Sequence, residues 1–124
     1  MTPPAIARWH AIAASGDVAA LGELLAPDAV FHSPVVFSPQ TGPAVAAYLG
    51  AAIRVLGGSL KYGEQWHGTS SSVLEFTAEL DGVHVNGVDI IRWNADDRIV
   101  AFKVMARPLK GINALREKMA AALL

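Results

Sequence analysis

One carboxyl group in an apolar stretch is the best candidate for chemistry in this sequence. It belongs to Asp89, within the strand-like run Val83 to Trp93, where alternate residues share one face. Ile91 and Trp93 share that face, so the carboxyl is surrounded by side chains that avoid water. A carboxyl in such a place has to be paired, hydrated in a cavity or protonated. Asp89 is therefore either a functional acid or a structural group that bonds the backbone or ends a strand, and the local pattern favours neither.

The other polar residues offer no comparable site. The four histidines are His10, His32, His67 and His84. No two of them have the i, i+4 spacing of helical metal ligands, and the chain has no cysteine, so we expect no metal and no cofactor. His32 is the best alternative base because it adjoins Ser33, but strand alternation turns these two side chains to opposite faces. A catalytic triad of Ser33, His32 and Asp89 is therefore not expected.

The composition excludes several classes of function. The 124 residues are 52% hydrophobic and 17% charged, which predicts a single domain over residues 1–124 with a sizeable core. Lys and Arg number 10 and Asp and Glu number 11, so no excess of charge favours nucleic acid or a membrane surface. No apolar run approaches the roughly 18 residues of a membrane span. Because Arg8 and His10 interrupt the apolar segment that a secretion signal requires, we expect a cytoplasmic protein.

Helical patterns dominate the first half of the chain. The Thr2-Pro3-Pro4 sequence predicts the start of a first helix, and Ser15-Gly16 its end. A short second helix is expected from Val18 to Leu25, capped by Asp17, and a short strand from Ala29 to Ser33. A third helix is expected from Thr41, as its cap, to about Leu56.

From Ser59 onward the apolar period changes to two, which is typical of strands. Four antiparallel strands are predicted at Leu60 to Gly68, Ser71 to Asp81, Val83 to Asn94 and Arg98 to Arg107. Their turns are Gly68-Thr69, Asp81-Gly82 and Asn94 to Asp97. A last helix after Pro108 carries an apolar stripe that either closes the domain or packs on a partner. Helices followed by a meander of strands predict an α+β fold.

Several fragments, in this order, carry a family resemblance. They are Ser15-Gly16-Asp17, Leu25 to Val30, Ser33-Pro34-Val35, Thr41-Gly42, and Gly87 to Asn94 followed by Arg98-Ile99-Val100. The chain thereby resembles the nuclear transport factor 2-like superfamily, in its SnoaL-like and ketosteroid-isomerase-like branch. The resemblance implies a cone-shaped fold, with N-terminal helices packed on a curved antiparallel β-sheet that encloses a pocket, plus a C-terminal helix.

The resemblance also assigns roles to three residues. In ketosteroid isomerase an Asp general base works beside an oxyanion hole of a Tyr and a protonated Asp. The protonated Asp falls on Asp89, the oxyanion Tyr on Trp9 and the general base on Ser33. A serine hydroxyl needs an activating neighbour, and an indole only donates. A steroid-type enolisation by the family's mechanism is therefore not expected, although Asp89, Ser33 and Trp9 remain the candidate catalytic residues.

The resemblance implies a ligand and a partner as well. The expected ligand is an apolar small molecule, held in a pocket whose wall is made by Val35, Phe37, Leu49, Ile53, Phe76, Ile91, Trp93, Phe102 and Val104. The expected function is isomerisation, cyclisation or hydration of an apolar carbonyl compound, with Asp89 as acid or hydrogen-bond donor. The alternative is binding of a lipophilic molecule without turnover, or a protein-interaction module. A homodimer through the outer sheet face is also expected.

Overall fold

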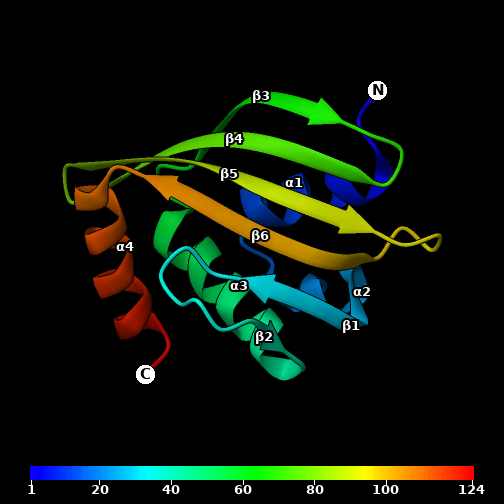
Figure 1. Cartoon of the computed structure of the whole chain (residues 1–124), viewed down its shortest axis with the longest axis horizontal. Coiled ribbons are helices and arrows are strands. Elements are labelled where there is room, and N and C mark those ends of the chain that lie inside the picture. The colour runs from blue at the N-terminus through cyan, green and yellow to red at the C-terminus, as the bar shows by residue number, and fades with distance from the viewer.

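The computed structural model describes all 124 residues, which form four helices and one six-stranded sheet (Figure 1). The helices are α1 (Pro4–Ser15), α2 (Leu21–Leu24), α3 (Pro43–Leu56) and α4 (Leu109–Ala122), and a 3₁₀ turn at Val18–Ala20 precedes α2. The strands are β1 (Leu25–His32), β2 (Gln40–Thr41), β3 (Lys61–His67), β4 (Ser71–Leu80), β5 (Val83–Trp93) and β6 (Ile99–Arg107). The predicted α+β fold is confirmed. None of these helices has the length and apolar character needed to cross a bilayer.

The strands lie in the order β2-β1-β6-β5-β4-β3. Strands β3 to β6 form the predicted antiparallel meander. Strand β1 instead runs parallel to β6, with Phe31 opposite Phe102 and His32 opposite Lys103, so the sheet is mixed rather than antiparallel throughout. No hairpin fixes the direction of β1 relative to β6, because α3 and the four strands β2 to β5 separate them along the chain.

Local turn chemistry explains the hairpins of the meander. Asp81 and Gly82 both have positive φ, 48° and 82°, as the two-residue turn between twisted antiparallel strands requires. At the β5–β6 turn, the side-chain oxygen of Asn94 accepts the backbone N–H of Asp96 and of Arg98, at 3.0 and 3.1 Å. The turns predicted at these two places are therefore confirmed.

The helix starts differ from the sequence-based expectation. Thr41 belongs to β2 and does not cap α3, and neither Gly42 nor Asp17 provides a side-chain cap. Gly42 adopts φ 62°, a conformation that glycine reaches without steric cost, so the backbone enters α3 directly from a sharp bend. The expected second helix is divided into the 3₁₀ turn and the single turn of α2.

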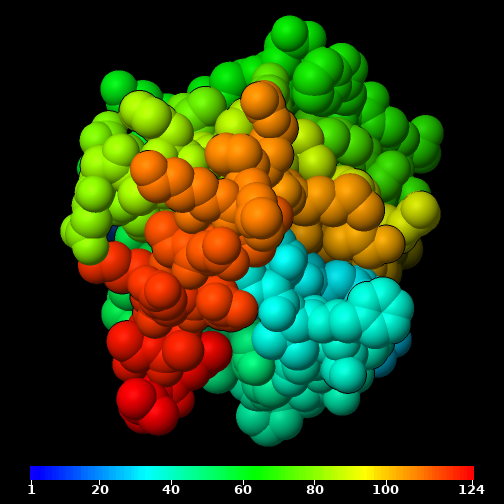
Figure 2. Space-filling model, turned by 60° about the vertical axis from the view of Figure 1, so that its left-hand side comes forward, coloured from blue at the N-terminus to red at the C-terminus, as the bar shows by residue number.

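The helices cover the inner face of the sheet and one of its ends. In Figure 1, α1 and α3 lie behind the strands, and α4 lies at the end near the β4–β5 turn. Leu115 and Met119 of α4 are buried in a cluster with residues of α3, β4 and β5. A Cβ at Gly111 would lie 2.6 Å from the carbonyl oxygen of His84, so glycine allows α4 to approach β5 closely. The last helix therefore closes its own domain, beside the segment that follows β1 (Figure 2).

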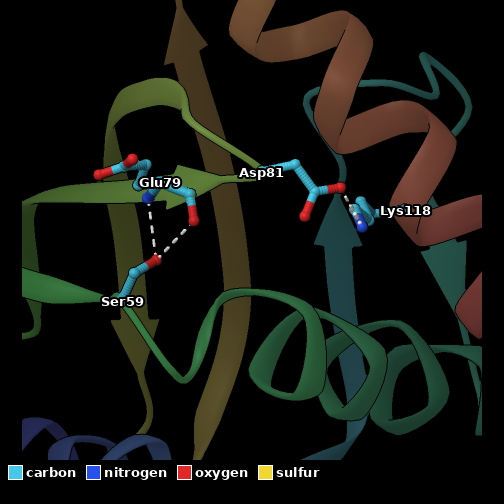
Figure 3. Close-up of polar contacts among 4 residues, drawn as sticks. All are labelled: Ser59, Glu79, Asp81 and Lys118. Atoms are coloured by element: carbon cyan, nitrogen blue, oxygen red, sulfur yellow. Dashed lines mark hydrogen bonds and ion pairs between the residues drawn. The ribbon is translucent and has the colours of Figure 1, made fainter.

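Two polar contacts join the segment after α3, and helix α4, to β4 and the turn that follows it (Figure 3). The Ser59 hydroxyl donates to the carbonyl oxygen of Glu79 at 2.9 Å and accepts its N–H at 2.8 Å. Lys118 Nζ lies 2.6 Å from Asp81 Oδ2 at the β4–β5 turn. Because the side chains of Lys118 and Asp81 are 45% and 77% exposed, this ion pair contributes little to stability.

Candidate functional site

Asp89 lies on the inner face of β5, in the middle of the sheet. Its neighbours across the sheet are Leu74 on β4 and Val104 on β6. Residues of β5 alternate between buried and less buried positions, and this alternation places Asp89 inward, where it is only 4% exposed. Its carboxyl is therefore surrounded by protein on a face that is otherwise apolar.

The carboxyl is held by a side chain and not by the backbone. The Tyr62 hydroxyl, from β3, donates a hydrogen bond to Asp89 Oδ2 at 2.5 Å. The indole Nε1–H of Trp9, from α1, donates to the same Tyr62 hydroxyl at 2.9 Å. Three elements distant in sequence thus supply one chain of hydrogen bonds, which we call the Trp9–Tyr62–Asp89 chain. This arrangement decides against the interpretation that Asp89 bonds the backbone.

A glycine on β5 helps to position the tyrosine. Tyr62, Phe76 and Gly87 lie in one row across β3, β4 and β5. A Cβ at Gly87 would lie 2.7 Å from Cζ of Phe76, so the missing side chain makes room for that ring. The ring of Phe76 in turn packs edge-on against Tyr62, with 6.3 Å between centroids. The His10 ring packs edge-on against the Tyr62 ring, with 4.7 Å between centroids, and forms a hydrogen bond with the Gln65 side chain. His10 thereby holds the Tyr62 ring from the side of α1.

Burial controls the protonation of this pair. Desolvation raises the pKa of Asp89 to about 7, against a smaller lowering effect of the Tyr62 hydrogen bond. Burial, and then the charge of Asp89, raises the pKa of Tyr62 far above its usual range. Tyr62 is therefore always protonated, whereas Asp89 is close to half-ionised at neutral pH. A carboxyl in this condition can either give or take a proton.

The Trp9–Tyr62–Asp89 chain borders a small, nearly apolar cavity of about 40 Å³, which we call the inner cavity. Asp89 and Tyr62 are the ionisable side chains of its lining. The predicted wall residues that line it are Val35, Leu49, Ile53, Phe76, Phe102 and Val104. Leu115 and Met119 of α4 also contribute. The inner cavity therefore combines walls from the sheet, α3 and α4 with one polar end.

Three predicted wall residues lie elsewhere. Ile91 and Trp93 are buried in the core between α1 and the sheet and do not line the inner cavity. Phe37 is fully exposed. It belongs to the irregular segment between β1 and β2, where no strand alternation directs its side chain inward. Phe37 therefore does not line the inner cavity.

The remaining predicted site residues take different positions. Trp9 is buried, and its N–H is engaged by Tyr62, so it supports the site through that hydroxyl. Ser33 lines the inner cavity, and its hydroxyl accepts the N–H of Val35 at 3.1 Å. The structure thus joins Trp9 to Asp89 through Tyr62, whereas Ser33 has no hydrogen bond to Asp89. No three His, Asp or Glu side chains lie together in the way that metal ligands would.

Sequence reasoning missed Tyr62, the direct partner of Asp89. In a regular strand Tyr62 would share a face with Leu60, which was the available signal. Trp66 would share that face as well, so the pattern did not single out Tyr62. The register of β3 against β4 shifts between Tyr62 and Gln65, and this irregularity reverses the faces beyond it. Tyr62 therefore points inward, while Trp66 is 50% exposed on the outer face.

Comparison with protein families gives a clear match. The model of the SnoaL-like domain matches residues 6–102, which include all three members of the Trp9–Tyr62–Asp89 chain. No curated protein matches the chain.

Solved structures with the same fold include two of substantial sequence identity. A steroid delta-isomerase from Pseudomonas aeruginosa is 39% identical, with a TM-score of 0.90, over 96% of this chain and 88% of that one. A protein with a cystatin-like fold from Silicibacter pomeroyi is 34% identical, with a TM-score of 0.89, over 95% and 84% of the two chains. The epoxide hydrolase/cyclase-like enzyme SalBIII is 18% identical, with a TM-score of 0.66 over 86% and 90%, and shares the fold alone.

Proposed function

Because this chain belongs to the SnoaL-like domain family, we propose that its inner cavity is a small-molecule site in which Asp89 transfers a proton of an apolar carbonyl compound. The observation that carries the proposal is the Trp9–Tyr62–Asp89 chain, which places a carboxyl with a pKa of about 7 at the polar end of an apolar cavity. A mostly apolar cavity with a few convergent polar groups is the usual form of a small-molecule site.

Isomerisation is the reaction that one such carboxyl can perform alone. Ionised Asp89 takes a proton from the carbon beside the carbonyl, and the C–H electrons form a new double bond while the carbonyl oxygen becomes negative. The substrate carries a second double bond one carbon further on, so protonated Asp89 returns the proton to the far carbon of that bond, while the carbonyl re-forms and the remaining double bond is conjugated with it. Isomerisation of a carbonyl compound also fits the name of the 39%-identical steroid delta-isomerase.

Tyr62 stabilises the charge that develops on the substrate oxygen. While Asp89 is ionised, the Tyr62 hydroxyl donates to it. Once Asp89 has taken a proton, the tyrosine proton is free to turn toward the oxyanion, and the Trp9 N–H continues to donate to the tyrosine oxygen. A donor aimed at developing charge in an apolar cavity is worth much more than the same donor in water.

Removal of the carboxyl tests this proposal. A small cyclic ketone with an unconjugated double bond is the probe, because its conversion to the conjugated ketone is followed by ultraviolet absorbance. We expect Asp89→Asn to lower kcat/KM by roughly 100-fold or more, since an amide cannot transfer the proton. Asp28→Asn, at an exposed position of β1, is the matched control and should retain the wild-type rate. Equal rates for wild type and Asp89→Asn would refute the role of Asp89.

Binding without turnover is the second candidate. It is favoured by the inner cavity itself, whose lining holds no second group that titrates near neutral pH to serve as a separate base. In that case the same ketone would raise the melting temperature of both wild type and Asp89→Asn, and no conjugated product would form.

We also propose a homodimer that uses the outer face of the sheet. Trp66, Val73 and Ile90 lie in one row across β3, β4 and β5 on that face, and Trp66 is 50% exposed. Lys103 continues this row on β6, so the proposed contact is confined to β3, β4 and β5. Apolar side chains exposed on one face of a sheet are typical of an interaction site.

Light scattering at micromolar concentration tests the dimer. We expect twice the chain mass for the wild-type protein and the mass of one chain for Trp66→Lys, because the substitution would bury a charge in the contact. Ala11→Lys, at an exposed position of α1 away from the outer face of the sheet, is the control and should leave the dimer intact. A wild-type mass equal to that of one chain would contradict the proposal.

A further inference from the structure

A second hollow lies beside the inner cavity and has no part in the proton transfer. Its volume is about 390 Å³, and we call it the outer hollow. It shares Ser33, Pro34 and Val104 with the lining of the inner cavity, so these three residues form a common wall. In Figure 2 the segment after β1 (cyan) meets the end of β6 (orange) on this side of the molecule.

The outer hollow exists because β1 is shorter than its neighbour. Strand β1 pairs with β6 only as far as His32 opposite Lys103. The chain then leaves the sheet at Ser33-Pro34, whereas β6 continues to Arg107. From Val104 onward, β6 has no strand neighbour on this side, and the gap brings the inner face of the sheet next to the outer hollow.

The ionisable side chains that line the outer hollow are both basic. Phe31 and Phe102 are paired and point inward, so the next pair, His32 and Lys103, lies on the outer face. These two are the ionisable residues of the hollow, and its lining contains no acidic side chain. Lys103 is half-buried and makes no ion pair, since the molecule's ion pair is Lys118–Asp81. A partly desolvated cation without a counter-charge favours the binding of an anion.

We propose that the outer hollow binds the anionic group of the ligand whose carbonyl end enters the inner cavity, and that Lys103 is its main contact. This inference rests on the proposed function of the inner cavity. The inner cavity, of about 40 Å³, is much smaller than the outer hollow, of about 390 Å³, so a ligand too long for the inner cavity extends past Ser33 and Val104 into the outer hollow. The ligand class is therefore an apolar carbonyl compound with a carboxylate at its far end.

Two matched probes test the inference by calorimetry on the protein in its solution oligomeric state. One is a straight-chain methyl ketone of medium length, and the other is the same ketone with a carboxylate at its far end. We expect the wild-type protein to bind the keto acid roughly 3- to 10-fold more tightly at low salt, with a smaller preference at high salt. Lys103→Met should abolish the preference, and Lys103→Arg should keep it. Lys110→Met, at an exposed position of α4, is the matched control and should also keep it.

The outcomes separate this inference from the proposed function. Asp89→Asn should lower the affinity for both probes equally and leave the ratio of the two affinities unchanged, because the carboxylate of the keto acid binds at Lys103. Equal wild-type affinities for the two probes, or a preference that survives Lys103→Met, would overturn the anion site and leave the inner cavity as proposed. If neither probe bound the wild-type protein, the anion site and the proposed function would both be refuted.

Discussion

The free energy of unfolding is expected to fall by on the order of 4 kcal/mol between about pH 4 and about pH 8 because of Asp89 alone. Burial raises the pKa of this carboxyl to about 7 in the folded protein, whereas the unfolded chain has the ordinary value of about 4. Between these values the folded state holds a proton that the unfolded state releases. The stabilising contribution is therefore complete below about pH 4 and is lost as the pH rises through about 7.

Asp89→Asn should remove this dependence and make the protein more stable than wild type above neutral pH. The asparagine carbonyl can still accept the hydrogen bond from Tyr62, but no charge has to remain buried. The measurement is urea unfolding across the pH range for wild type, Asp89→Asn and the surface control Asp28→Asn. All other ionisable groups are common to wild type and Asp89→Asn, so the difference between their curves reports Asp89 alone. Parallel curves for wild type and Asp89→Asn would show that the carboxyl is ionised at low cost.

Removal of the Tyr62 hydroxyl is expected to have the second-largest effect on stability, because two buried groups lose a hydrogen-bond partner. In Tyr62→Phe the Trp9 N–H loses its acceptor and Asp89 loses its donor. Leaving buried polar groups without partners costs about 1–3 kcal/mol of stability. The hydrogen bond from Tyr62 also lowers the pKa of Asp89, so the variant should have a pKa above about 7 and an activity profile shifted to higher pH.

Carbon-detected NMR of the Asp89 carboxyl measures this shift directly. Tyr48→Phe is the matched control, because the Tyr48 ring packs on Phe31 while its hydroxyl makes no hydrogen bond within the protein and does not line the inner cavity. Tyr48→Phe should leave the Asp89 titration unchanged. If Tyr62→Phe titrated like wild type as well, the hydrogen bond would have no influence on the protonation of Asp89.

The features that the sequence predicts well are those determined by neighbouring residues. Alternation along β5 places Asp89 inward, and the Asp81-Gly82 pair fixes its hairpin. The parallel pairing of β1 with β6 depends on residues far apart in the chain, so local patterns do not contain it. Phe37 shows the same limit, because a segment outside the sheet has no period from which its direction can be inferred.

The site itself was predictable in part. Asp89 follows from its place among apolar residues, and Trp9 from the family resemblance. Tyr62 lies just before the register shift in β3, and the strand pattern does not reveal which side of that shift faces inward. The resemblance places the tyrosine on the first helix, at the position of Trp9, whereas in the structure the tyrosine is Tyr62 of β3. Trp9 supports Tyr62 by donating a hydrogen bond to its hydroxyl.

The pairing of β1 with β6 also determines when the site can be completed as the chain is synthesised. Strands β3 to β6 follow one another along the chain, so the meander that carries Tyr62 and Asp89 assembles through local turns. Strand β1 leaves the ribosome early but has its main sheet partner only after β6 has emerged. Until then Trp9 of α1 and Phe31 of β1 lack Phe102 of β6, the ring on which both pack, so these two segments are incompletely covered and prone to misassociation in the nascent chain.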